Sequence, residues 1–217
     1  AVVSGSQHSR QCSGGSGRDG GADQLVPTCV IGTDYVVTRG QDDNDPSPAN
    51  YATIVAITSN TVVTINGNTV ATLNAGQFYT YNMPSPNGSI YYINTSEPAY
   101  VYQFGSVQNN GEIGMAIAAP IDGCRGDTYI EFFEFPNSTR NEATIIIINA
   151  GLSTLELNGQ PYTNFAAAQP VPGLPGYSVV QFEDADLSAY NVVTSDEYFT
   201  ASQFVGNSSG GTFGYLT

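Results

Sequence analysis

The chain has 217 residues and a formal net charge of −14, because 19 acidic residues face five arginines and no lysine. Nucleic acids and anionic membranes are bound mainly through clustered basic side chains, so this charge excludes a nucleic-acid partner and disfavours direct membrane association. Charged residues make up only 11% of the chain, and no run reaches the ~18 apolar residues of a membrane span. The surface must therefore consist largely of neutral polar groups, as in secreted and cell-surface proteins.

The first segment, residues 1–33, is predicted to form an N-terminal arm or loop. Residues 4–24 contain many glycines and serines and few apolar groups, a composition typical of loops, whereas the valines just before them suit a strand. Little else would order this segment, so we expect a disulfide between Cys12 and Cys29 in an oxidising compartment. Cys124 would then be buried or paired with another chain.

From Asp34 onward, short runs rich in Val, Ile, Thr, Tyr and Phe are separated by Gly, Asn, Pro and Ser, which is the pattern of an all-β fold. No segment has the periodicity of an amphipathic helix. Residues 145–148 are all isoleucine, which predicts a central strand covered on both faces. The predicted strands are 34–39, 50–57, 61–65, 69–73, 78–83, 89–93, 97–105, 112–118, 127–135, 143–149, 153–157, 178–182, 190–194, 198–206 and 211–216.

This β region contains an internal repeat. The matching segments, in the same order in both copies, are ATIVAI at 52–57 with ATIIII at 143–148, TVVTING at 61–67 with STLELNG at 153–159, and 95–104 with 194–204. We therefore expect two duplicated β-sandwich-like lobes, residues 34–126 and 127–217, packed as one unit. Packing of the two lobes on each other would cover both faces of the isoleucine strand.

Each copy of the repeat contains an Asn-Gly pair, Asn66-Gly67 in the first and Asn158-Gly159 in the second. Asparagine and glycine tolerate the positive φ angles that a type I′ turn requires at both central positions. The sequence therefore predicts a hairpin tip at each pair.

Several short motifs give the chain a family resemblance. They are SGSQ at 4–7, DQLVP at 23–27, GTDYVVTRG at 32–40, TVVTING at 61–67, LNAGQ at 73–77, SEPAYVYQFGS at 96–106, a Pro-then-Cys-x-Gly element from Pro120 to Gly126, and GGTFGYLT at 210–217. Taken together they resemble the N-terminal domain family of the IgG Fc-binding protein, over essentially the whole chain. The resemblance implies a binding or adhesion module without catalytic residues, of the kind found in large secreted mucus-associated proteins and in bacterial surface proteins.

Groups suited to catalysis are scarce. The single histidine, His8, lies in the N-terminal arm, so a catalytic triad is not expected. Two carboxylate pairs, Asp184 with Asp186 and Glu131 with Glu134, have the chemistry of a glycosidase, but their turn and strand settings indicate solvated surface. We therefore predict no enzymatic activity and no organic cofactor.

One acidic loop suits a metal ion. Asp42, Asp43 and Asp45 lie beside Asn44 in a segment that ends at Pro46. Calcium takes roughly six to eight oxygen ligands, so the loop is interpreted either as a structural calcium site or as a solvated acidic loop. The sequence leaves both interpretations open.

Two further motifs are typical of extracellular proteins. Residues 125–127 form an RGD tripeptide, which integrins recognise in some ligands, although Gly126 equally suits a turn into the next strand. N-glycosylation sequons are short enough to occur by chance. They begin at Asn87, Asn94, Asn137 and Asn207.

Tyr100, Tyr102 and Phe104 share one face of a predicted strand. Aromatic side chains in such a row either fill a core or form a stacking platform for sugars and partner proteins. We interpret this row as core.

The sequence thus favours an extracellular or cell-surface adhesion module that recognises a glycan or a protein without catalysis. The alternative is a self-assembling subunit of an extracellular filament or sheath, in which Ala1, Val2 and Val3 add a strand to the open sheet edge of a neighbouring copy.

Overall fold

The computed structural model describes residues 3–9, 19–24, 26–40, 50–84, 86, 88–105, 114–121, 126–134, 138, 140–207 and 210–215. These residues form antiparallel sheets joined by turns, so the all-β class predicted from the sequence is confirmed. Within them there is no α-helix. The short 3-10 helices are η1 (Thr28–Val30), η2 (Asn149–Thr154), η3 (Tyr162–Asn164) and η4 (Asp184–Asp186).

The first half of the β region, strands β3 to β10, forms two sheets. One sheet has the order β3 (Asp34–Thr38), β8 (Ile90–Thr95), β5 (Thr61–Ile65), β6 (Asn68–Leu73), and the other has the order β10 (Gly114–Ile117), β9 (Ala99–Gly105), β4 (Asn50–Ala56), β7 (Phe78–Met83). The two sheets share a buried core that includes Tyr35, Ile54, Ile93 and Val101. Buried and half-exposed residues alternate along β4, β5 and β9, so this half is a sandwich.

The second half is built around one long strand, β17, which pairs with β11 and β13 near Val193 and with β12 and β18 from Phe199 onward. Its core includes Ile145, Leu157 and Phe182. Residues 194–204 of β17 match residues 95–104 in the sequence repeat, where the chain is divided into β8 and β9. Pro98 lies between those two strands and cannot donate a ladder hydrogen bond, whereas β17 contains no proline. The strands of this half are β11 (Asp127–Phe133), β12 (Arg140–Ile148), β13 (Glu156–Leu157), β14 (Gln160–Pro161), β15 (Gln169–Pro170), β16 (Tyr177–Phe182), β17 (Tyr190–Asn207) and β18 (Gly210–Tyr215).

The two halves repeat the same hairpin, and the prediction for both Asn-Gly pairs is confirmed. Asn66 and Gly67 have φ angles of 49° and 79°, and Asn158 and Gly159 have 54° and 73°. The side-chain Oδ1 of Asn66 accepts a hydrogen bond of 2.8 Å from the amide of Tyr92. In the second half, Asn158 Oδ1 accepts one of the same length from the amide of Val192.

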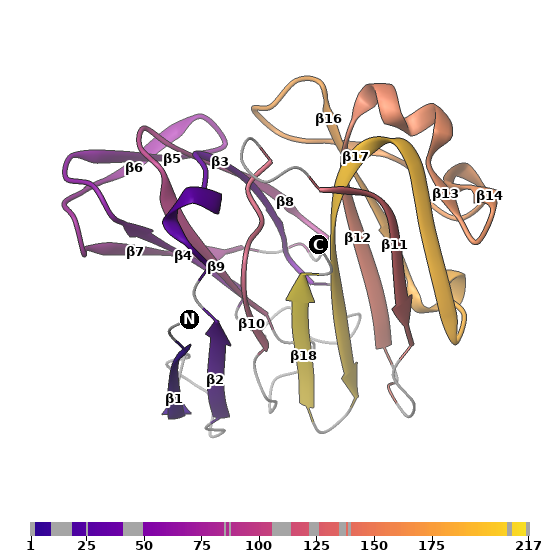
Figure 1. Cartoon of the computed structure of the whole chain (residues 1–217), viewed down its shortest axis with the longest axis horizontal. Coiled ribbons are helices and arrows are strands. Elements are labelled where there is room, and N and C mark those ends of the chain that lie inside the picture. The colour runs from indigo at the N-terminus through magenta and orange to yellow at the C-terminus, as the bar shows by residue number, and fades with distance from the viewer. Residues whose placement is uncertain are drawn as a thin grey trace.

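Strand β12 has both faces buried. Ile145 and Ile147 lie in the core of the second half. Ile146, only 3% exposed, packs in another cluster with Val36 and Ile90 of the first half. Figure 1 shows β3 to β9 on one side of the molecule and β11 to β17 on the other, with β10 and β18 between them.

A second contact joins the halves at Gly105, at the end of β9. A Cβ atom at this position would lie 2.3 Å from the ring of Phe204 in β17. Phe204 is 1% exposed, so its ring occupies the space that any larger residue at 105 would need. The sequence of β9 therefore has to end in glycine for this packing.

The N-terminal segment, expected to form an arm or loop, contains a pair of strands. Strands β1 (Val3–Ser9) and β2 (Asp19–Gln24) form an antiparallel pair in which Val3 lies opposite Gln24 and Gly5 opposite Ala22. Backbone hydrogen bonds can hold a pair of strands even where side-chain propensity is low, because β-propensity is a weak and context-dependent preference. Figure 1 shows the pair beside β10, and β2 contacts that strand.

Candidate functional site: an exposed aromatic face

Strand β11 presents aromatic side chains to solvent. Along this strand the inward residues Ile130 and Phe132 are 5% and 3% exposed, while Tyr129 and Phe133 are 47% and 64% exposed. Glu131 lies between these two outward aromatics and is also exposed. The alternation follows from the two-residue period of a strand, which sends successive side chains to opposite faces.

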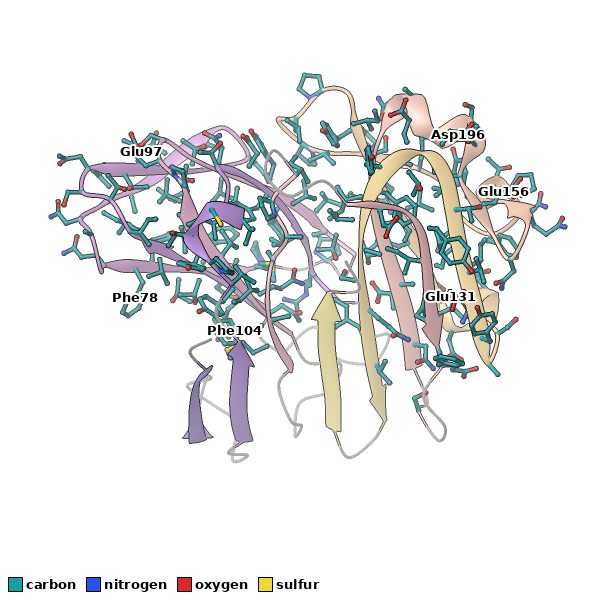
Figure 2. All side chains as sticks on the ribbon, in the orientation of Figure 1. Phe78, Glu97, Phe104, Glu131, Glu156 and Asp196 are labelled. Atoms are coloured by element: carbon teal, nitrogen blue, oxygen red, sulfur yellow. The ribbon has the colours of Figure 1, made fainter. Side chains whose placement is uncertain are left out.

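The neighbouring strand adds a third ring. Tyr190, at the start of β17, lies opposite Phe133 in the sheet register. The two ring centroids are 5.2 Å apart with planes at 50°, a tilted geometry that aromatic pairs favour. We call Tyr129, Glu131, Phe133 and Tyr190 the aromatic face. Figure 2 shows Glu131 on the outer side of the second half.

The aromatic face carries one fixed negative charge. The hydroxyl of Tyr129 donates a hydrogen bond to the carboxylate of Glu131. This bond, with a further one from Tyr190, lowers the pKa of Glu131 below its ordinary value. The same carboxylate raises the pKa of the phenols of Tyr129 and Tyr190. At neutral pH the face therefore holds an ionised carboxylate among neutral rings.

Exposed aromatic side chains that gather on one face differ from singly scattered ones, which are normal on protein surfaces. Here they stand on two hydrogen-bonded strands, so the sheet fixes their spacing. Aromatic anchors of this kind are enriched in protein interfaces. The aromatic face is therefore the candidate binding site.

Sequence reasoning did not identify the aromatic face as a site. Glu131 was considered only as half of a carboxylate pair with Glu134, and Tyr190 is distant from β11 in the sequence. The sequence does contain a signal for it: alternation along the segment DTYIEFF at 127–133 places two aromatic rings and a carboxylate on the same side of a strand.

The prediction that Tyr100, Tyr102 and Phe104 form core is wrong. On β9 the buried residues are Ala99, Val101, Gln103 and Gly105, and the aromatic residues are half-exposed on the other face. Alternation defines two faces but does not say which one turns inward. The face with Ala99 and Val101 turns inward, where it packs in the same core as Tyr35, Met83 and Ile93.

The outward aromatics of β9 have partners of their own. The Tyr102 and Phe104 rings stack with centroids 6.3 Å apart. The Tyr100 hydroxyl donates a 2.7 Å hydrogen bond to the carbonyl of Val26, just before η1. This surface is therefore partly covered within the chain, in contrast to the aromatic face.

The carboxylate pairs considered for glycosidase chemistry are engaged in local structure. Asp186 accepts a 3.0 Å hydrogen bond from the amide of Glu183, which caps η4. Asp184 accepts one of 3.0 Å from the amide of Asn141, and Glu134 accepts one of 3.3 Å from the side-chain amide of Asn141. Glu131 is bound by Tyr129 instead.

Most of the remaining candidate residues lie outside the described residues. This applies to Cys12, Cys124, Asp42, Asp43, Asp45, Asn87, Arg125 and Asn137. The disulfide, the calcium site and those glycosylation sites therefore stay predictions, and Asn207 ends β17 with its side chain undescribed. Cys29 is exposed on η1. Among the residues that are described, no three His, Cys, Asp or Glu side chains come together to hold a metal ion.

Two candidates in the described part have structural contacts. The side-chain amide of Asn94 donates a 2.9 Å hydrogen bond to Asp34, and attachment of a glycan would disturb this bond. At Gly126, a Cβ atom would lie 1.7 Å from the carbonyl oxygen of Phe199. The close approach of β11 to β17 therefore requires glycine within the RGD tripeptide.

The described residues form an antiparallel β module whose second half carries the aromatic face. Residues 1–205 match the family described as IgGFc binding protein, and the chain belongs to this family. No curated protein and no solved structure matches it. In the part of the chain that the structure describes, no helix is long and apolar enough to cross a membrane.

Proposed function

We propose that the chain is an extracellular, non-catalytic binding module that attaches to a protein partner through its aromatic face. The observation that carries the proposal is membership of the IgGFc binding protein family over residues 1–205. The aromatic face supplies a contact surface of the type that such a role needs.

The sheet and the contacts between the rings hold the aromatic face in place. Its residues stand on paired strands, and the Phe133–Tyr190 contact fixes two of the rings before a partner arrives. Ordering of flexible side chains opposes binding by ~0.5–1.5 kcal/mol for each side chain. A preformed aromatic surface avoids part of this loss.

An extracellular setting is supported by the composition. Charged residues make up 11% of the chain, and lysine is absent, so neutral polar groups finish the surface. Catalysis is not part of the proposal, because the only histidine lies in the N-terminal segment and the carboxylates of Asp184 and Asp186 hold local structure.

The first test uses the purified full chain immobilised on a biosensor, with immunoglobulin G Fc fragment as the probe suggested by the family description. A second probe is a mucin, intact and after enzymatic deglycosylation. Saturable binding of Fc, or of mucin irrespective of its glycans, is expected for a protein-binding module. If only the glycosylated mucin binds, the partner is a glycan and not a protein. If neither probe binds, the proposal is contradicted for these partners.

The same preparation tests the filament alternative. Light scattering that grows with time and disappears when residues 1–10 are removed would indicate self-assembly through the N-terminal segment. In the structure Val3 is paired with Gln24 of the same chain, so exchange between copies would have to release this pairing.

A further inference from the structure

The aromatic face combines rings with a carboxylate, and we propose that its occupant is an arginine side chain presented by the partner protein. This inference rests on the proposed function, and it specifies the chemistry of the group that the face binds. Three features of the face support it: the rings, the remaining acceptor capacity of Glu131, and the charge of the surrounding surface.

The rings suit a planar cation. Tyr129 and Phe133 are about half exposed or more, and Tyr190 is tilted against Phe133. A guanidinium group stacks on the face of an aromatic ring and is attracted by its negative quadrupole. An aliphatic side chain would be stabilised only by burial of its apolar surface and would make no hydrogen bond to the Glu131 carboxylate.

The carboxylate of Glu131 keeps acceptor capacity for a ligand. An ionised carboxylate offers about four lone-pair sites, and two tyrosine hydroxyls are directed to it. The remaining sites face the solvent side of the strand, where Glu131 is exposed. A guanidinium group can donate hydrogen bonds to these carboxylate sites while its plane stacks on a ring. The compact ammonium group of lysine has no plane to stack and fits this arrangement less well.

The surrounding surface is acidic. Glu156 on β13 and Tyr129 on β11 both lie opposite Thr194 of β17, so Glu156 is in the same cross-strand row as the aromatic face. Asp127, two residues before Tyr129 on β11, is also exposed. With a net charge of −14, the molecule attracts a cationic segment and repels an anionic one.

The described part of the chain supplies no cation of its own to this face. Its one described basic side chain, Arg39, is 2% exposed and donates a 2.6 Å hydrogen bond to the carbonyl of Met83 in the first half. A neutral sugar could also stack on the rings and donate a hydroxyl to Glu131, but the net charge of the molecule would not attract it. Charge complementarity therefore favours arginine.

The test uses the full chain, labelled with nitrogen-15, and a short acetylated peptide of alternating arginine and glycine. Matched peptides replace every arginine with lysine or with citrulline, which has the same shape without the charge. The arginine peptide is expected to shift the amide resonances of β11 and of Tyr190. The lysine peptide should cause smaller shifts, and the citrulline peptide should cause none.

The variant Glu131→Gln removes the charge and is expected to weaken binding of the arginine peptide roughly tenfold or more, since hydrogen bonds to charged groups are the stronger class. Glu97→Gln is the matched control, because Glu97 lies at the opposite end of the molecule (Figure 2) and the net charge changes equally. Circular dichroism and thermal unfolding of both variants check that each is folded.

Equal affinity for arginine and citrulline peptides, or unchanged affinity in Glu131→Gln, would overturn the inference. A neutral oligosaccharide that shifts the same resonances in place of the peptide would also overturn it and identify a sugar site. If Fc or mucin protein binds and the arginine peptide does not, only this inference fails. If no partner protein and no peptide binds, the proposed function fails as well.

Discussion

At Glu131 the local hydrogen bonds decide the charge of the candidate site. The Tyr129 hydroxyl is the largest cause of the lowered carboxyl pKa, and Tyr190 adds to it. Because a protonated carboxyl group is a weaker acceptor for both bonds than a carboxylate, the ionised form is the one that the face stabilises.

The residue-scale prediction concerns Tyr129→Phe. Loss of the first donor should raise the pKa of Glu131 toward its ordinary value of 4.5. A carboxyl group whose pKa is lower in the folded than in the unfolded protein stabilises the fold at pH values above the unfolded pKa. This stabilisation is lost as the pH falls through the folded pKa, so the variant, which has less of it, should lose less stability on acidification. The pKa of Glu131 is measured by NMR, from the side-chain carboxyl carbon resonance of Glu131 in a titration from about pH 2 to about pH 7. Tyr100→Phe is the control, and an unchanged pKa in Tyr129→Phe would contradict the assigned bond.

At the scale of single elements, β11 depends on Gly126. The backbone of β17 comes so close that a Cβ at this position would overlap the carbonyl of Phe199. The substitution must therefore push the start of β11 away from β17 and disturb the strand that carries the aromatic face.

Gly126→Ala should accordingly destabilise the protein by about 1–3 kcal/mol, the range for overpacked sites. Gly214→Ala in β18 is the matched control, because nothing lies within 4 Å of its added Cβ, and we expect a change below about 1 kcal/mol. Urea unfolding followed by circular dichroism compares the two. Equal stabilities of both variants would contradict the close approach of β11 to β17.

Elements with strong local signals were predictable from the sequence. The two Asn-Gly hairpins follow from the φ angles that these residues tolerate, and the isoleucine run of β12 follows from its two apolar faces. The pairing of β1 with β2 was missed, because it is held in a glycine-rich segment where side chains give little strand signal. The inward face of β9 was misjudged, because hydrophobicity alone does not reveal how much space the opposite sheet leaves.

The aromatic face required tertiary information. Tyr129, Glu131 and Phe133 could be placed on one side of a strand from alternation alone. The sequence does not reveal that Tyr190 lies opposite Phe133, because that register depends on how β17 pairs with β11. Whether this side faces solvent or another sheet is likewise decided only by packing of the whole second half.

At the scale of the whole molecule, each half repeats the same hairpin contact with a neighbouring strand, yet the exposed aromatics differ. The second half carries the aromatic face on β11 and the start of β17, while in the first half the outer surface of β9 is partly covered by the segment before η1. The two halves therefore share a hairpin contact but differ in their outward residues. The proposed partner contact belongs to the second half only.

Two exposed phenylalanines allow this assignment to be tested directly. Phe133 on β11 and Phe78 on β7 are 64% and 66% exposed, and Phe78 lies at the far end of the molecule from Glu131 (Figure 2). Truncation of either side chain at the surface should leave the fold intact, since neither is part of a buried core.

The measurement is the affinity of Phe133→Ala and Phe78→Ala for the protein partner that the unmodified chain binds on the biosensor. We predict that Phe133→Ala weakens binding roughly tenfold or more, as for an interface anchor, while Phe78→Ala binds like the unmodified chain. Equal affinities for both variants, or a loss confined to Phe78→Ala, would contradict the claim that the aromatic face is the binding site.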